Sequence, residues 1–322
     1  MRKTVAVLYG GRSGEHEVSI RSAESIMKAL DPERYNVLHF FINKFGRWSP
    51  RPIVPEPGRN AEIDVVFPVL HGTFGEDGTV QGLLELADLP YVGPGVLGSA
   101  AAMDKEVAKR LCCQAGVPVV DYLVVDRDFQ VEQNTLPYPL FVKPANLGSS
   151  VGISKARTPE ELTAAVALAA QFDRKILIER TIVGQEIECA VLGNREPAAS
   201  VPCEILPSRE FYDYEDKYLL DRTEFRLPAD LPEDRIQEIR RLAVLAFQAL
   251  QCEGMARVDF LIEGSTGQIF LNEVNTIPGF TSISMYPKMW EHSGLPYPKL
   301  LDRLIDLAIE RHADKQKLRY TR

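Results

Sequence analysis

The sequence predicts an α/β protein whose C-terminal half becomes α+β. Three observations support this class: an N-terminal strand–helix–strand order, a pair of C-terminal strands with a short link, and a length of 322 residues. A chain of this length usually exceeds what one hydrophobic core supports, so we expect two or three domains. The Gly- and Pro-rich segment Pro90–Ser99 and the pair Val183-Gly184 are candidate boundaries.

The first region is expected to form a parallel α/β unit. Thr4–Tyr9 has the character of a buried strand that ends at Gly10-Gly11, and Val18–Leu30 has the apolar spacing of a helix. Asn36–Ile42 and Ile63–Leu70 are further strand candidates. A strand, a helix and another strand in this order indicate parallel pairing.

The second region should alternate helices and strands. We expect a helix from about Ser99, a strand over Tyr138–Lys143 and a glycine–serine loop over Asn146–Gly152. A helix should then begin at Thr158-Pro159-Glu160-Glu161, because this run combines an N-cap, a proline at the first helical position and the glutamate of a capping box. Lys175–Arg180 is the next strand candidate.

The remaining part of the chain is richer in strands. Its one long internal helix should span Glu233–Gln251, where the apolar residues form a single stripe. Ala256–Glu263 and Gln268–Asn275 form an expected hairpin, linked by a three-residue turn, Ser265-Thr266-Gly267, with the glycine in the left-handed conformation. A terminal helix near Pro298–His312 closes the chain.

Composition and charge exclude several classes of protein. Apolar residues make up 45% and charged residues 25%, which are values of a packed globular chain. The formal charge of −8 and the lack of a basic run argue against nucleic-acid and membrane partners. No apolar run could span a bilayer or serve as a signal peptide, so we expect a cytoplasmic protein. The five cysteines include no Cys-x-x-Cys pair and are expected to be core or bystander thiols.

The expected hairpin carries the most informative polar pattern. Its three-residue turn would place Asp259 opposite Glu273 and Arg257 opposite Asn275, with all four on one face. Two carboxylates and an amide, with no His or Cys nearby, favour Mg²⁺. A surface hairpin with alternating polar residues is the alternative. The loop Thr276–Ser282, with its backbone amides and hydroxyls, favours the metal site.

Other segments can be interpreted either as ligand-binding segments or as ordinary surface segments. Lys143 and the small residues Gly148–Gly152 could bind phosphate oxygens, or the segment could be a flexible surface loop. Ile178–Arg180 and Glu186 offer acceptors for an adenine amino group and ribose hydroxyls, or are surface charges. Phe211–Tyr218 is either a lid that excludes water or an aromatic-anchored surface loop.

Two strand-exit loops in the first region are ambiguous as well. Gly10–Glu17 lacks the G-x-G-x-x-G spacing, which argues against a dinucleotide site. Glu15 or Glu17 could favour the positive end of the next helix, or a carboxylate could bind an ammonium group. His71–Gly78 contains one histidine, which is more often structural than catalytic.

In combination, these segments resemble the D-alanine:D-alanine ligase family of the ATP-grasp superfamily. The match runs from Gly10 to Ser284 in the order of the family's motifs, and the joint pattern is highly specific. The motifs are GGRSGEHEVS at Gly10, LHGTFGEDG at Leu70, MDK at Met103, VKPANLGSSVG at Val142, IERTIVGQE at Ile178, YDYEDKY at Tyr212, ARVDF at Ala256 and NEVNTIPGFT at Asn272. The resemblance implies an N-terminal α/β domain (1–98), a central ATP-grasp subdomain (99–184) and a C-terminal subdomain with the metal site and the lid (185–322).

The resemblance also implies a reaction and its reactants. ATP would activate one D-alanine as an acyl phosphate, and a second D-alanine would attack it to give D-alanyl-D-alanine for peptidoglycan, with ADP and phosphate. Two Mg²⁺ ions would be required, Mn²⁺ could substitute, and activation by K⁺ stays open. The protein would be a homodimer.

The implied nucleotide and metal residues extend over the last two domains. ATP would be held by Lys105, Lys143, Ser149, Ser150, Glu179, Arg180, Ile182, Glu186, Lys217 and Asn272. The metal ions would be held by Asp259, Glu273 and Asn275. Arg180 and Met285 stand where other members can carry Lys and Leu, and a cationic or apolar side chain remains at each.

The implied substrate and catalytic residues come from all three domains. The two D-alanines would be bound by Glu15, His71, Ser284 and Met285, and catalysis would involve Glu15, Ser149, Lys217, Tyr218, Arg257 and Gly279. Glu15, Ser149 and Tyr218 would form a hydrogen-bonded triad, and a tyrosine at 218 implies the dipeptide rather than D-alanyl-D-lactate. Arg257 and the Gly279 amide would stabilise the oxyanion of the tetrahedral adduct.

Three other functions fit less well. Another ATP-grasp ligase would lack Glu15 together with the YDYEDKY segment, and both are present. A decayed nucleotide-binding regulator should have lost Asp259, Glu273 or Lys143, which are intact. An NAD-dependent oxidoreductase needs a glycine spacing that the first loop does not have.

Overall fold

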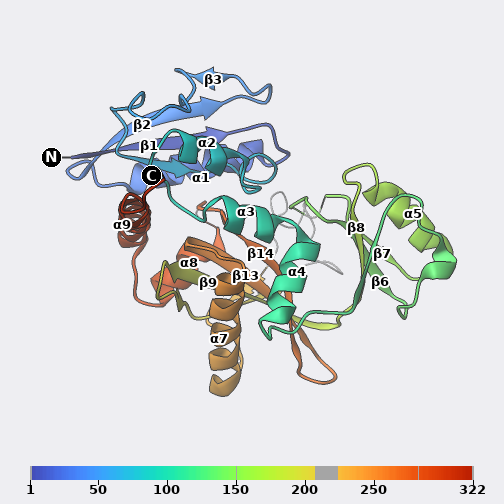
Figure 1. Ribbon diagram of the computed structural model, residues 1–322. Coiled ribbons are helices and arrows are strands. Elements are labelled where there is room, and N and C mark those ends of the chain that lie inside the picture. The colour runs from blue at the N-terminus through green and yellow to red at the C-terminus, as the bar shows by residue number, and fades with distance from the viewer. Residues whose placement is uncertain (1, 150, 207–223, 282, 321–322) are drawn as a thin grey trace.

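Three β-sheets with their covering helices form the protein (Figure 1). The computed structural model describes residues 2–149, 151–206, 224–281 and 283–320. Helices and sheets are both present, so the predicted class is confirmed. In the first sheet the central strands pair in parallel and one edge strand pairs antiparallel, whereas the strands of the other two sheets pair antiparallel. The domain boundaries at 98/99 and 184/185 stay predictions. None of the helices within the described ranges is long and apolar enough to cross a bilayer.

The N-terminal sheet is the predicted parallel unit. Its elements are β1 (Lys3–Gly10), α1 (His16–Ala29), β2 (Tyr35–Ile42), β3 (Trp48–Ser49), β4 (Val65–Pro68) and α2 (Thr79–Leu86). The strand order is β3-β2-β1-β4, and β1 pairs in parallel with both β2 and β4. Val7 and Phe67 share a core with Leu300 and Leu304 of the last helix, α9 (Tyr297–Lys315). The end of the chain therefore packs against its beginning (Figure 1).

The central region begins with two helices, not one. They are α3 (Val96–Met103), which is the helix expected from about Ser99, and α4 (Lys105–Gln114), which was not predicted. The helical conformation is interrupted at Asp104, whose backbone is extended. The Asp104 side chain accepts hydrogen bonds from the amides of Glu106 and Val107, both at 3.1 Å. An aspartate at an N-cap stabilises a new helix start, which explains the break.

An antiparallel sheet follows these helices. Its elements are β5 (Tyr122–Val125), a 3₁₀ turn η1 (Val131–Gln133), β6 (Leu140–Pro144), β7 (Ser154–Ala156), α5 (Pro159–Ala169) and β8 (Ile176–Arg180), with strand order β5-β8-β6-β7. The predicted start of α5 is confirmed, since Thr158 accepts a bond from the Glu161 amide at 3.2 Å. The Glu161 carboxylate reaches the Arg157 amide at 2.7 Å, one residue before the cap.

The third sheet carries helices on both faces. Its elements are β9 (Gly184–Gly193), β10 (Ala198–Ala199), β11 (Cys203–Leu206), β12 (Glu224–Arg226), α7 (Glu233–Ala249), β13 (Gly254–Glu263), β14 (Ile269–Asn275) and α8 (Met285–His292). Cys189 and Val191 of β9 pack with α7, whereas Ala190 and Leu192 pack with α8 and α9. Four of the five cysteines are buried and Cys113 is exposed, and all are free.

The β13–β14 hairpin has the predicted register but not the predicted turn. The loop has four residues, 264–267, closed by a 2.7 Å bond from the Gly267 amide to the Glu263 carbonyl, so the three-residue turn is wrong. Gly267 is left-handed as expected, with φ +71°. A β-bulge at Asn272 adds one residue to β14 and restores the pairs Asp259–Glu273 and Arg257–Asn275. Because β13 lies between β9 and β14, the surface-hairpin alternative is wrong.

Candidate active site

A cavity of about 700 Å³ lies where the N-terminal sheet, the glycine–serine loop and the β13–β14 hairpin meet. Its walls bring together ten of the residues predicted for the site. They are Glu15, His71, Lys105, Ser149, Arg257, Glu273, Asn275, Gly279, Ser284 and Met285. These residues come from all three predicted domains, so folding assembles a site that is dispersed along the sequence.

The hairpin presents oxygen donors to this cavity. Asp259 pairs with Glu273, and Asn275 lies two residues further along β14 on the same face. Asn275 Oδ1 is buried and accepts no hydrogen bond from any residue that the structure describes. An orphaned amide oxygen beside two carboxylates fits Mg²⁺. Within the described ranges no three His, Cys, Asp or Glu side chains are grouped for metal binding, so the site depends on this amide.

Arg257 lies on the same face of the hairpin as Asp259 and lines the cavity. It donates from Nε and Nη2 to the two carboxylate oxygens of Asp259, at 2.8 and 2.7 Å. Its Nε also lies 3.2 Å from Glu188 Oε1 on β9. Burial opposes the charge of Arg257, but the two carboxylates outweigh it and raise the pKa of the guanidinium. A cation fixed in this way can stabilise a developing negative charge without reorganising.

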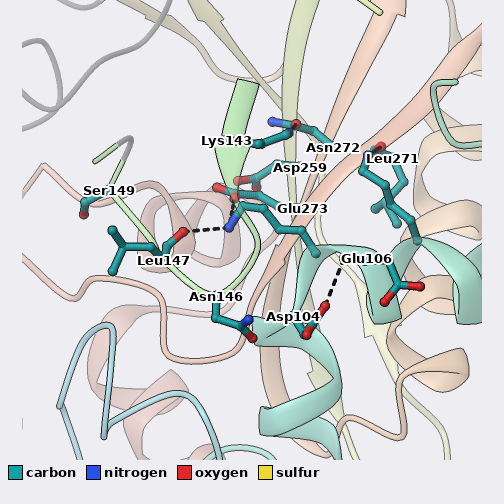
Figure 2. A network of polar contacts seen from close by, with 12 residues as sticks. Asp104, Glu106, Lys143, Asn146, Leu147, Ser149, Asp259, Leu271, Asn272 and Glu273 are labelled. Carbon is teal, nitrogen blue, oxygen red and sulfur yellow. Dashed lines mark hydrogen bonds and ion pairs between the residues drawn. The ribbon is translucent and has the colours of Figure 1, made fainter. Parts of the chain in front are cut away.

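Lys105 ties the glycine–serine loop to the hairpin. Its Nζ lies 3.4 Å from Glu273 Oε2 and donates to the Leu147 carbonyl at 2.8 Å, and Figure 2 shows Leu147 and Glu273 converging. Asn146 fixes the start of the loop, because its amide and its side chain both donate to Asp173 Oδ2, at 2.8 and 3.0 Å. Lys105 thus stands where an anion held by the loop would approach the Glu273 carboxylate.

A second set of predicted nucleotide residues lies beside the cavity. Lys143 Nζ lies 2.7 Å from Glu179 Oε2 and donates to Asn272 Oδ1 at 3.4 Å. Figure 2 shows Lys143 and Asn272 next to the hairpin carboxylates. Arg180 is turned toward the hairpin loop, where it bonds Glu263 at 2.5 Å.

Neither this second set nor the remaining predicted nucleotide residues that the structure describes line the cavity. Glu186 lies on β9, and Ile182 lies in the link between β8 and β9. Ser150 and Lys217 fall outside the residues that the structure describes, as do Tyr218 and the rest of the predicted lid.

Glu15 points into the cavity instead of capping its helix. It stands at the N-cap of α1 without a capping hydrogen bond, and its Oε1 accepts a bond from the Ser149 hydroxyl. Glu17 is exposed and pairs with Lys44 at 2.8 Å. Gly72 is left-handed, with φ +72°, and a β-carbon there would lie 2.7 Å from Glu15 Oε2. Glycine at 72 therefore leaves room for the carboxylate.

His71 contacts the loop after β14 directly through Nδ1 and, by way of Ser22 on α1, through Nε2. Nδ1 lies 2.9 Å from the Ile277 carbonyl and therefore carries the proton, because a carbonyl can only accept. Nε2 then accepts from Ser22 Oγ at 3.3 Å, and Ser22 Oγ accepts from the Phe280 amide at 3.2 Å. Burial lowers the pKa of His71, although Glu15 opposes the shift. The histidine is thus neutral and fixed in one tautomer.

Glu76 also links the N-terminal region to the loop after β14. Its Oε1 accepts from the Ile277 amide at 3.1 Å and its Oε2 from the Gly72 amide at 2.6 Å. Burial, with the nearby charge of Glu15, raises the pKa of Glu76 to about 8. Ser22, His71 and Glu76, which we call the loop bracket, hold the backbone on both sides of Gly279. The N-terminal region thereby fixes the amide predicted to face the oxyanion.

Four residues of the site were not predicted from the sequence: Ser22, Glu76, Lys109 and Glu188. Glu76 belongs to the LHGTFGEDG motif, and Lys109 follows Lys105 by one helical turn, so each had a weak signal. Glu188 follows Glu186 at strand spacing. Ser22 had no signal, because its role depends on contacts with residues more than 200 positions away.

Models of a known family match most of the chain. The model described as "D-ala D-ala ligase N-terminus" matches residues 4–57 and 51–94, and that described as "D-ala D-ala ligase C-terminus" matches residues 111–306. A D-alanine–D-alanine ligase of Solibacter usitatus is 65% identical, with 100% of both chains covered. One from Thermoanaerobacter pseudethanolicus is 50% identical, with 98% of both covered.

Solved structures show the same relationship. The D-alanine-D-alanine ligase of Coxiella burnetii superposes with a TM-score of 0.88 at 41% identity, covering 98% of this chain and 96% of that one. The VanG D-Ala:D-Ser ligase of Enterococcus faecalis gives a TM-score of 0.86 at 38% identity, covering 96% and 100%. One fold thus serves ligases named for different acceptors.

The loop bracket leads to a prediction for Ser22→Ala. The substitution leaves the buried Phe280 amide without a partner, which should lower the free energy of unfolding by about 1–3 kcal/mol. It should also lower kcat by roughly tenfold or more, because small displacements of a catalytic group are costly. Steady-state turnover and thermal unfolding measure both effects.

Ser293→Ala is the matched control. Ser293 Oγ likewise accepts from a distant backbone amide, that of Val201, at 2.9 Å, but lies outside the cavity. Because this bond is exposed to solvent, the control should lose less stability than Ser22→Ala, and it should keep its kcat. A wild-type kcat for Ser22→Ala would show that the bracket does not position the loop for catalysis.

Proposed function

Because this chain belongs to the D-alanine–D-alanine ligase family, we propose that the cavity is where it joins two D-alanines with ATP. The family reaction gives D-alanyl-D-alanine for peptidoglycan, with ADP and phosphate. The observation that carries this assignment is the orphaned Asn275 Oδ1 beside Asp259 and Glu273, with Lys105 and Arg257 close by. An oxygen-donor set bordered by cations suits a phosphoryl transfer between anions.

The first step brings two anions together. The carboxylate of the first D-alanine attacks the γ-phosphorus of ATP, and Lys105, Lys143 and, from the lid, Lys217 offset the negative charge. When bound, two Mg²⁺ ions, or Mn²⁺ in their place, supply further charge neutralisation, with Asp259, Glu273 and Asn275 as the holding residues. The bond to ADP breaks as the acyl phosphate forms.

The second step takes place at the carbonyl of this acyl phosphate. Glu15 holds the ammonium of the first D-alanine, near His71, within the triad of Glu15, Ser149 and Tyr218. Ser284 binds the carboxylate of the second D-alanine beside Met285. The amine of the second D-alanine attacks the carbonyl of the acyl phosphate, and phosphate leaves. Arg257 and the Gly279 amide stabilise the oxyanion of the tetrahedral adduct.

The nucleotide base and the lid complete the proposal. Glu179, Arg180, the Ile182 backbone and Glu186 border the adenine and ribose, Asn272 approaches the nucleotide beside Lys143, and Ser149 and Ser150 cover the phosphates. The Tyr212–Tyr218 segment closes over them and excludes water, because acyl phosphates hydrolyse. We place the enzyme in the cytoplasm as a homodimer. Buried free cysteines and the use of ATP support that location.

The metal assignment predicts the behaviour of Glu273→Gln. Purified wild-type protein with ATP, Mg²⁺ and D-alanine should release ADP, phosphate and the dipeptide. Glu273→Gln should lower kcat by about a hundredfold or more with little change in the thermal midpoint, since a metal-bound transition state is worth several kcal/mol. Glu253→Gln, just before β13, should behave as wild type. Unchanged turnover in Glu273→Gln would remove Glu273 from the metal site.

The triad predicts a change of acceptor in Tyr218→Phe. The bond between Ser149 and Glu15 is the described part of the triad, and removing the tyrosine hydroxyl should loosen the remainder. We expect dipeptide formation to fall and the use of D-lactate relative to D-alanine to rise by roughly tenfold. Competition assays with both acceptors measure the ratio. An unaltered ratio would exclude Tyr218 from acceptor selection.

A further inference from the structure

Lys109 is a buried cation to which the proposed mechanism gives no role. It lies on α4 one turn after Lys105, and only 1% of its side chain is exposed. Burial lowers the pKa of this lysine, and Glu179 opposes the shift. Removing an ammonium group from water costs several kcal/mol unless a partner compensates it. A position this unfavourable needs a compensating interaction.

Glu179 is that partner, and it is shared with Lys143. Lys109 Nζ lies 3.0 Å from Oε1 of Glu179, and Lys143 Nζ lies 2.7 Å from Oε2. Lys109 also donates to the Leu271 carbonyl of β14 at 3.5 Å, just before the bulge at Asn272. Three elements, α4, β8 and β6, thus meet in one buried row of charges.

The row carries one net positive charge, because two ammonium groups flank one carboxylate. Burial opposes ionisation of Glu179, but Lys109 and Lys143 outweigh it and hold the pKa of the carboxyl below its ordinary value. If Lys109 were absent, the Glu179 carboxylate would offset the positive charge of Lys143 by itself. An ammonium group has three N–H donors. The described contacts of Lys143, to Glu179 and Asn272, leave it capacity for a phosphate oxygen.

We propose that Lys109 is a positioning residue for the nucleotide: its charge compensates Glu179 and leaves the charge of Lys143 to the phosphates of ATP. This inference rests on the proposed nucleotide site. A purely structural ion pair would affect thermal stability without affecting the nucleotide. The positioning role requires the charge itself, so it should appear in nucleotide affinity and be independent of D-alanine.

Lys109→Gln tests the charge, since glutamine keeps a polar group and loses the cation. In the full-length protein, the Kd for ADP with Mg²⁺, measured by calorimetry, should rise about tenfold, which corresponds to 1.4 kcal/mol. The KM for ATP should rise likewise, while kcat at saturating ATP and the KM for D-alanine stay within about twofold. Lys109→Arg should recover most of the affinity.

Lys175→Gln is the matched control. Lys175 pairs with Asp104 at 2.6 Å and with Glu106 at 2.9 Å at the start of the same helix and does not touch Glu179. Its ADP affinity should stay within about twofold of wild type. Equal affinities for Lys109→Gln and Lys175→Gln would overturn the proposal. Wild-type protein that forms no dipeptide would instead contradict the proposed function.

Lys109→Arg covers the case in which Lys109→Gln does not fold, because it keeps the positive charge beside Glu179 and exchanges the ammonium for a bulkier guanidinium. ADP affinity within about threefold of wild type in Lys109→Arg supports the charge argument. A loss of tenfold or more in folded Lys109→Arg would overturn it.

Discussion

The register of the β13–β14 hairpin is the constraint on which the rest of the site depends. The four-residue loop alone would place Asn272, not Glu273, opposite Asp259, and a one-residue slip turns every following side chain to the other face. The bulge at Asn272 reverses that slip. It also lets two consecutive residues contact lysines, Asn272 at Lys143 and Glu273 at Lys105. A single inserted residue thus determines which oxygen donors share one face of the hairpin and brings Glu273 to Lys105, which contacts the glycine–serine loop.

Around this hairpin, the buried charges are balanced locally and not by the molecule as a whole. The chain carries a formal charge of −8, yet buried cations accompany the carboxylates of the site. The pairs are Lys105–Glu273, Lys109–Glu179, Lys143–Glu179, Arg257–Asp259 and Arg257–Glu188. Such pairing keeps charges inside a low-dielectric cleft and holds cations ready for anionic reactants. The loop bracket then couples this centre to the N-terminal region, which we propose binds the amino group of the first D-alanine.

Local patterns in the sequence were enough for the element types and for the residues of the hairpin face, because apolar periodicity and strand alternation are short-range. The α5 start at Thr158 followed from its cap. The break at Asp104 was missed, because the residues on both sides of it favour a helix and only the capping by Asp104 interrupts that preference. The loop length and the bulge were both missed, and the two errors cancelled. Ser22 and Lys109 depend on partners distant in the sequence, which no local pattern reveals.

Anomalous diffraction from a crystal grown with ADP and Mn²⁺ tests the central claim most directly. If the bulged hairpin is the metal site, anomalous peaks will lie within coordination distance, roughly 2 Å, of Asn275 Oδ1 and of carboxylate oxygens of Asp259 and Glu273. The orphaned amide oxygen will then have gained its missing partner. Nucleotide bound in the cleft with no anomalous peak at Asn275 or at either carboxylate would contradict the account.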